Sequence, residues 1–322
     1  MMPPVAGSRT RWTVGISIVV IVLVGLWGAA FFFSSRGSSG SDGQFNEETV
    51  DAGTSSTKVA MINIVGEIFS DPEGFAEGAS DANIIDQLDQ AQDDSSVKAI
   101  ILRLDTPGGG VVASDAISSK VRKIRKAGKP VVALMGDVAA SGGYYIAASA
   151  DEIIASPSTW TGSIGVIAML PNVEKAAEKI GVSVTVIKSG KFKDIGSLYR
   201  AMTPEEQGIF QGLIDEAYDG FVKVVATGRR LSETRVRELA DGRIYSGSQA
   251  KGLGLVDRLG DVDVAFSRAK ILGRAPDASL VRYTSPGGLR SLLGVNSALS
   301  AASIKRELGI PRKPGAAYLW LP

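Results

Sequence analysis

A serine in a glycine-rich stretch is the residue of this sequence that most clearly suggests chemistry. Ser141 stands in GDVAASGGYYIAASAD, residues 136–151, directly after the apolar run PVVALM. A serine between a strand and a helix, followed by Gly142, has the mechanics of a nucleophile elbow, although the G-x-S-x-G pattern is absent. A serine that only caps the helix is the competing interpretation. If Ser141 is a nucleophile, another group must take its proton.

The composition removes the usual partner of such a serine. The chain has 322 residues, and none of them is histidine or cysteine. This excludes a Ser-His-Asp triad, thiol nucleophiles and zinc–thiolate sites, and we expect no metal and no cofactor. The net charge of +1 gives no reason to expect nucleic acid as a partner.

Lysine is the side chain that could still act as the base. At its reference pKa of ~10.4, only about one lysine in 2,500 is neutral at pH 7. Burial that lowers the pKa to ~8 makes roughly a tenth of the amines neutral and costs about 3 kcal/mol. The segment IKSGKFKDIGS, residues 187–197, offers Lys188, Lys191 and Lys193. For each of them an exposed loop lysine is the alternative.

A second glycine-rich turn could supply hydrogen-bond donors. LDTPGGG, residues 104–110, lies between an apolar strand pattern and a helical pattern. The backbone N–H groups of such a turn can bind an anion near a helix N-terminus. The turn is neither a Walker loop nor a G-x-G-x-x-G motif, and a purely structural tight turn is the alternative. Together with the Gly142 N–H, it could form an oxyanion hole.

Strand and helix patterns alternate from Lys58 onward. Strands are predicted at 58–66, 97–104, 130–135, 151–156, 163–169 and 182–190, and helices at 82–92, 111–128, 142–150, 172–181 and 203–228. The last helix begins with the capping-box sequence Thr203-Pro204-Glu205-Glu206. Its predicted buried stripe consists of Phe210, Leu213, Ala217, Phe221 and Val224. The alternation indicates an α/β fold with repeated strand–turn–helix crossovers.

The first 57 residues predict a membrane anchor followed by a linker. Residues 13–33 are apolar and uncharged, and about 20 such residues span a bilayer. The arginines at positions 9 and 11 favour a cytoplasmic N-terminus at 1–12 and an extracytoplasmic catalytic domain in the cell membrane. A cleaved signal peptide is the rival interpretation. Residues 34–57 are rich in serine and glycine and predict a flexible linker.

The remaining boundaries divide the chain into a folded domain at 58–284 and a tail at 285–322. The tail ends in the apolar sequence AYLWLP. This end could be disordered, or it could bind elsewhere on the protein.

Five segments, in order, resemble the signal peptide peptidase A family. They are LDTPGGGVVASDAI, VVALMGDVAASGGYYIAASAD, TWTGSIGVIA, IKSGKFKDIGS and ADGRIYSGSQAKGLGLVDRLG. The family consists of serine–lysine proteases, and the resemblance covers roughly residues 58–270. It implies a ClpP/crotonase-like spiral of β-β-α units in the single-domain form of the family. Thr106 is a small departure, since the family pattern is expected to have serine there.

The resemblance also implies roles for single residues. Ser141 would be the nucleophile and Lys193 the general base, with Lys191 as the alternative that spacing alone leaves open. Gly142 and Gly109 would form the oxyanion hole.

Two further residues would hold the lysine. By the same resemblance, Ser163 in TWTGSIGV would bind the lysine amine, together with Thr161.

The family resemblance implies an assembly and a substrate class. The base would come from the neighbouring subunit of a ring- or dome-shaped homo-oligomer, an octamer by resemblance. Remnant signal peptides and other apolar or unfolded peptides would be the substrates. The end AYLWLP resembles such a substrate and could occupy a groove of its own assembly or be trimmed there. An acyl-CoA enzyme of the crotonase type and a non-catalytic membrane scaffold are the rival functions.

Overall fold

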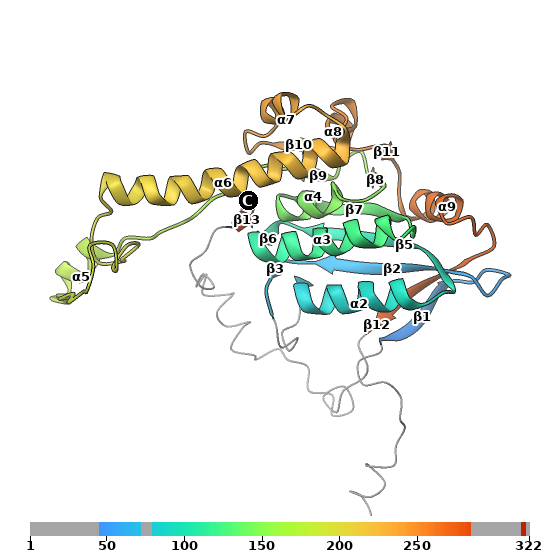
Figure 1. Cartoon of the computed structure of the whole chain (residues 1–322), viewed down its shortest axis with the longest axis horizontal. Coiled ribbons are helices and arrows are strands. Elements are labelled where there is room, and N and C mark those ends of the chain that lie inside the picture. The colour runs from blue at the N-terminus through green and yellow to red at the C-terminus, as the bar shows by residue number, and fades with distance from the viewer. Residues whose placement is uncertain (1–44, 72–78, 285–316, 320–322) are drawn as a thin grey trace, which may run out of the picture. The chain divides into compact units, whose positions relative to one another are not determined.

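The computed structural model describes residues 45–71, 79–284 and 317–319 (Figure 1). The predicted anchor at 13–33 lies outside these ranges. Within them, no helix has both the length and the apolar character that crossing a membrane requires.

A large, mostly parallel sheet forms the centre of the described fold. Its order is β1-β12-β2-β5-β7-β8-β11. The strands are β1 (Asn46–Asp51), β2 (Lys58–Val65), β5 (Val97–Thr106), β7 (Val131–Ala140), β8 (Glu152–Ala155), β11 (Arg258–Leu259) and β12 (Ser279–Thr284). In this row only β1 runs antiparallel to its neighbour. The predicted α/β class is confirmed.

Two short strands extend this sheet beside the end of β7. β9 (Trp160–Gly162) pairs parallel with the last three residues of β7, and β10 (Ile244–Ser246) pairs antiparallel with β9. A second sheet has the order β13-β6-β3-β4. It consists of β3 (Ile68–Phe69), β4 (Ala79–Ser80), β6 (Gly108–Gly110) and β13 (Ala317–Leu319).

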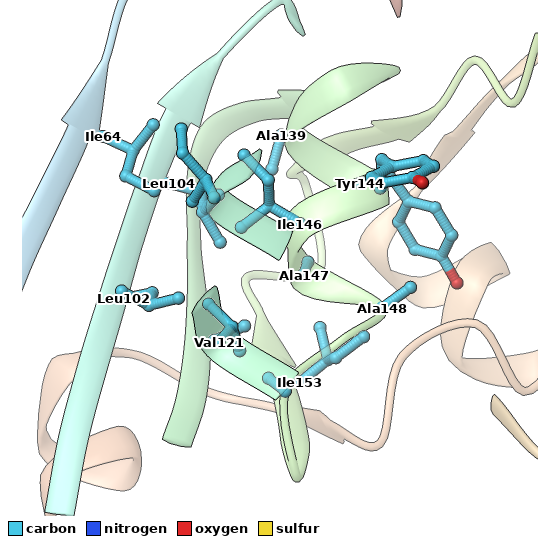
Figure 2. Close-up of a cluster of buried hydrophobic side chains, with 14 of the residues drawn as sticks. Ile64, Leu102, Leu104, Val121, Ala139, Tyr144, Ile146, Ala147, Ala148 and Ile153 are labelled. Atoms are coloured by element: carbon cyan, nitrogen blue, oxygen red, sulfur yellow. The ribbon is translucent and has the colours of Figure 1, made fainter. Parts of the chain in front are cut away.

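Helices cover both faces of the large sheet because its strands alternate side chains between the faces. One face packs against α2 (Asp81–Asp93), α3 (Val111–Lys126), α4 (Gly142–Ala147) and α6 (Pro204–Arg229). Figure 2 shows part of this core, where Ile64 and Leu104 of the sheet lie close to Ile146 of α4. The other face packs against α9 (Val262–Leu272). The shorter helices are α5 (Glu174–Lys179), α7 (Glu233–Leu239) and α8 (Gly247–Gly252).

The structure differs from the sequence prediction in three segments. Residues 163–169 and 182–190 are not strands, although Ile167 forms an isolated bridge. No strand among the described residues pairs with 182–190, so no ladder forms there, and Val182, Val184 and Val186 are 46%, 49% and 46% exposed. Conversely, residues 46–51 of the predicted linker form β1, since the edge of β12 offers them hydrogen-bond partners.

The long helix α6 has a sharply defined start. Its capping box is present: Thr203 Oγ1 accepts from the Glu206 N–H, and Glu206 Oε2 accepts from the Thr203 N–H at 2.9 Å. The predicted buried stripe holds only toward its C-terminal half. Phe221 is buried, whereas Leu213 is 57% exposed. The N-terminal half therefore lies away from the core of the described protomer (Figure 1).

The C-terminal half of α6 packs tightly on α4, the helix that follows Ser141. The Phe221 ring meets the Tyr145 ring edge-on, with the ring centroids 5.1 Å apart. Gly228 passes so close to the end of α4 that a Cβ there would lie 1.8 Å from the Ala148 carbonyl oxygen. A glycine at position 228 is therefore a packing requirement.

We expect Gly228→Ala to lower the free energy of unfolding by about 1–3 kcal/mol, because the added methyl group collides with fixed backbone. Gly220→Ala in the same helix is the matched control, since a Cβ there has no neighbour within 4 Å. It should stabilise the helix by up to about 1 kcal/mol. Urea unfolding of both full-length variants measures the difference, and equal midpoints would contradict the proposed contact.

Candidate active site

Ser141 occupies the sharp turn between β7 and α4. Its φ of 53° and ψ of −115° are costly for a residue with a side chain. Its side chain makes no capping hydrogen bond. The residue is 1% exposed, and its Oγ has no hydrogen-bond partner among the described residues. A buried hydroxyl without a partner costs ~1–3 kcal/mol, so neither packing nor capping explains this serine.

The two predicted oxyanion glycines lie together beside this turn. A Cβ on Gly142 would lie 3.2 Å from the Gly109 nitrogen, and a Cβ on Gly109 would lie 1.9 Å from the Ile68 carbonyl oxygen. Both close approaches therefore need glycine. The Gly142 N–H is at the first position of α4, where N–H groups lack intrahelical acceptors. The structure thus brings the backbones of both predicted donors to the nucleophile, as an oxyanion hole requires.

Thr106 fixes the shape of the glycine turn. Its Oγ1 accepts from the Gly108 N–H at 3.1 Å and donates to the Gly66 carbonyl at 2.5 Å. The threonine is fully buried. The departure from the family pattern at this position therefore keeps the hydroxyl that holds the turn.

Thr161 and Ser163, the two residues predicted to hold the lysine amine, flank a residue that contacts the Ser141 turn. The Ser141 N–H donates to the Gly162 carbonyl at 2.8 Å, which places the turn against the residue between them. Thr161 Oγ1 donates to the Ala139 carbonyl at 2.7 Å, so its lone pairs still allow it to accept a hydrogen bond. Ser163 is 8% exposed and has a left-handed φ of 47°. The Thr161 hydroxyl therefore lies on the backbone of β7 two residues before Ser141, and Ser163 follows the residue that accepts from the Ser141 N–H.

Sequence reasoning missed Ser114 of α3. Its Oγ is buried, has no partner among the described residues, and would lie 2.5 Å from a Cβ on Gly142. A serine on the buried face of a helix, three positions before Ile117, was the available signal. Two hydroxyls without partners, at positions 114 and 141, therefore flank the same glycine.

The three candidate lysines differ in their charge partners. Lys188 forms an ion pair with Asp194 at 2.6 Å, and Lys191 forms one with Glu205. Such pairs stabilise the ammonium form and oppose action as a base. Lys193 has no ion pair among the described residues. This difference favours Lys193, which spacing alone could not separate from Lys191.

No hydrogen bond connects Lys193 to Ser141 among the described residues of the chain. Lys193 is exposed, whereas Ser141 is buried and has no hydrogen-bond partner. The structure therefore places the predicted nucleophile, the two predicted oxyanion glycines and the strand that carries Thr161 together, but it does not bring the predicted base to them.

An extended segment from the C-terminal end lies along the glycine turn. β13 pairs antiparallel with β6, which sets position 318 opposite Gly109. β13 also contacts α3 and α4. The edge of β6 beside the predicted oxyanion hole can therefore accept a peptide in strand conformation, a common mode of peptide recognition.

Comparison with known proteins relates this site to peptidases. Residues 123–275 match "Peptidase family S49". The chain is 39% identical over 243 residues to "Putative signal peptide peptidase SppA" of Enterococcus faecium, covering 74% of this chain and 71% of that protein. It is 45% identical over 221 residues to a "putative protease" of Synechocystis sp., covering 68% and 76%. A "putative protease" of Methanocaldococcus jannaschii is 37% identical over 271 residues, covering 83% and 84%.

We expect Gly109→Ala to lower kcat for an apolar fluorogenic peptide about 10²-fold or more, because the backbone must move to relieve the contact with Ile68 and displaces an oxyanion donor. Gly110→Ala is the matched control. A Cβ there would have its nearest neighbours at 3.8 and 3.9 Å, an ordinary contact distance. Similar losses in the two variants would argue against a specific role for Gly109.

Proposed function

Because the chain belongs to peptidase family S49 and is a serine peptidase of the signal peptide peptidase A type, we propose that it hydrolyses peptides through a dyad of Ser141 and Lys193. The observation that carries this proposal is the buried, unpartnered hydroxyl of Ser141, held at a strained turn beside Gly109 and Gly142. Membership in a peptidase family favours peptide hydrolysis over the acyl-CoA chemistry of the crotonases.

The proposed reaction proceeds through an acyl-enzyme. The neutral Lys193 amine takes the proton of Ser141 as Oγ attacks the peptide carbonyl carbon. The Gly109 and Gly142 N–H groups stabilise the resulting oxyanion. The lysine then protonates the leaving amine as the C–N bond breaks. The same lysine then takes a proton from a water molecule as that water attacks the ester carbonyl, and it gives this proton to Ser141 Oγ as the C–Oγ bond breaks.

We propose that the lysine acts on the serine of a neighbouring subunit. Residues 187–203, which we call the lysine loop, are bound to the start of α6 by the ion pair of Arg200 with Glu206, whereas α4 packs on the same helix at Phe221. These two positions are 15 residues apart, or about 22 Å along a helix. This separation supports the expectation that a protomer cannot supply its own base.

The surface around the lysine loop supports the same assembly. Exposed apolar side chains are frequent in residues 167–199, which include the lysine segment, and on the N-terminal half of α6: Ile167, Met169, Ile180, Val182, Val184, Val186, Ile187, Leu198, Tyr199, Ile209 and Leu213. Apolar surface of this kind marks a protein interface. A second copy of the chain is the proposed occupant, because its Ser141 needs the base that this surface presents. Contact with that copy would also exclude water from the lysine.

The finer features of the prediction belong to the same proposal. The chain has a ClpP/crotonase-like spiral fold, and identical subunits assemble into a ring or dome. Residues 13–33 anchor it in the cell membrane, with residues 1–12 in the cytoplasm and the catalytic domain outside. Its substrates are remnant signal peptides and other apolar or unfolded peptides. The β6 edge supports this substrate class, because backbone pairing accepts varied sequences.

The end of the chain is the proposed occupant of this edge in the resting enzyme. β13 already pairs with β6 opposite Gly109. A segment bound there would compete with substrate for the same backbone groups. We therefore propose that residues 315–322 act as a tethered inhibitor, which the enzyme could also trim.

We expect Ser141→Ala and Lys193→Ala each to lower kcat at least about 10³-fold, and Lys191→Ala to change it only a few-fold. Assembled together, the Ser141→Ala and Lys193→Ala chains should regain about a quarter of the wild-type rate if they mix at random around a ring. Peptide hydrolysis by detergent-solubilised full chains measures this. A mixture as inactive as its components would contradict a shared dyad, and an active Lys193→Ala variant would contradict this base.

We expect deletion of residues 315–322 to lower the apparent KM about 3–10-fold with little change in kcat, because a tethered competitor at high effective concentration is removed. A full-length chain with Gly/Ser in place of these eight residues is the control for chain length. Unchanged KM in both variants would exclude the inhibitory role. Mass spectrometry of wild-type and Ser141→Ala chains tests for trimming.

A further inference from the structure

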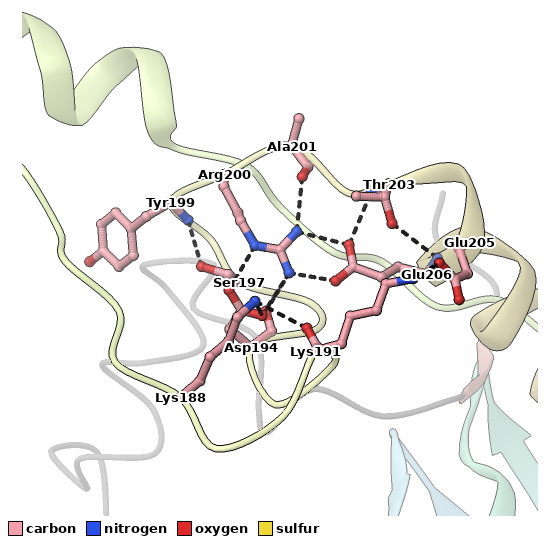
Figure 3. A network of polar contacts seen from close by, with 10 residues as sticks. All are labelled: Lys188, Lys191, Asp194, Ser197, Tyr199, Arg200, Ala201, Thr203, Glu205 and Glu206. Carbon is pink, nitrogen blue, oxygen red and sulfur yellow. Dashed lines mark hydrogen bonds and ion pairs between the residues drawn. The ribbon is translucent and has the colours of Figure 1, made fainter.

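Asp194 follows the proposed base, Lys193, and its carboxylate binds Lys188 and Arg200. Arg200 donates two parallel hydrogen bonds to Asp194, from Nε to Oδ2 and from Nη2 to Oδ1, both at 2.9 Å (Figure 3). Lys188 Nζ donates to Oδ1 of the same carboxylate at 2.6 Å. Oδ1 of Asp194 therefore accepts two hydrogen bonds from cations and Oδ2 accepts one.

The other edge of the Arg200 guanidinium holds the start of α6. Nη1 donates to Glu206 Oε2 at 2.8 Å, and Nη2 donates to Oε1 of the same side chain. Glu206 is the capping-box residue that also accepts from the Thr203 N–H. One arginine thus links the lysine loop to the first turn of the helix.

The carboxylates of Asp194 and Glu206 are nearly buried, and the cations Lys188 and Arg200 balance their charge. The Asp194 and Glu206 side chains are 10% and 3% exposed. The charged groups facing Asp194 are Lys188 and Arg200, and Glu206 faces Arg200 from α6. The remaining carboxylate of that turn, Glu205, is bound by Lys191.

Both carboxylates stay charged at working pH. Hydrogen bonds from Arg200, and next from Lys188, hold the pKa of Asp194 well below its usual range. Hydrogen bonds from Arg200, and next from the Thr203 backbone, lower the pKa of Glu206 to about 2. A permanently charged carboxylate beside Lys193 would favour the ammonium form of that lysine if it were free to pair with it.

We propose that Arg200 is a positioning residue for Lys193: it binds the Asp194 carboxylate in competition with the lysine amine, and it fixes the loop to α6. The inference rests on the proposed dyad. It explains why an aspartate can stand next to a base that must be neutral. It also explains why Lys193 has no ion pair among the described residues while Lys188 and Lys191 each have one.

The test is the pH dependence of kcat/KM in the detergent-solubilised full chain. In Arg200→Gln, Asp194 loses the two hydrogen bonds from the guanidinium and can pair with Lys193. We expect at least a tenfold loss of kcat/KM at pH 7 and an upward shift of the acidic limb by about one pH unit. Adding Asp194→Asn to this variant should return the limb to its wild-type position, because the free carboxylate is gone. Arg235→Gln, which breaks the exposed pair with Glu238, is the matched control and should leave the profile unchanged.

If Arg200 only linked the lysine loop to α6, without affecting the charge of Lys193, the result would differ. This alternative predicts that Asp194→Asn moves the limb no less than Arg200→Gln does, and that the double variant is not rescued; either finding overturns the proposal. If Arg200→Gln does not assemble, as sedimentation would reveal, Asp194→Asn alone decides, and its limb must not shift upward. An inactive Lys193→Ala with an unchanged Arg200→Gln profile leaves the dyad in place and removes this role. An active Lys193→Ala removes the dyad and this role together.

Discussion

In the proposed mechanism, the need for a neutral amine constrains the rest of this structure. A chain without histidine must activate its serine with a group that prefers to be charged in water. Desolvation makes lysine a base, yet a lysine buried permanently in the protomer would destabilise its fold. The described protomer keeps the two needs apart, with a buried serine on the sheet and an exposed lysine on a distant loop. In the proposed assembly, contact between subunits would then complete the activation.

The sheet holds the strained turn at Ser141 in place. β5 and β7 are parallel neighbours, so the glycine turn after β5 and the serine turn after β7 emerge at the same edge. Their backbones come into contact there because the residues that meet have no side chains. The strain at Ser141 is stable because buried strands and α4 fix the chain on both sides of it.

Local patterns predicted most of the core but not its surroundings. The apolar runs of β2, β5 and β7 and the capping box of α6 are readable because each depends on neighbours in sequence. β1 was missed, and 182–190 was predicted as a strand, because strand formation depends on a partner edge that sequence does not identify. At the site, the serine and glycine turns were predicted, and so was the lysine segment. The Arg200 fork and the hydroxyl of Ser114 were not, since they depend on which side chains meet in space.

Helix α6 is also a spacer of fixed length. Its 26 residues rise about 39 Å, with the lysine loop bound at one end and α4 packed near the other. In the proposed ring, this rod would set the repeat distance between successive active sites. Each inserted residue would turn the loop by about 100° around the helix axis, so only near-whole turns would keep the lysine facing its partner. Related enzymes could then change ring dimensions only in steps, with the helical repeat as the unit of change.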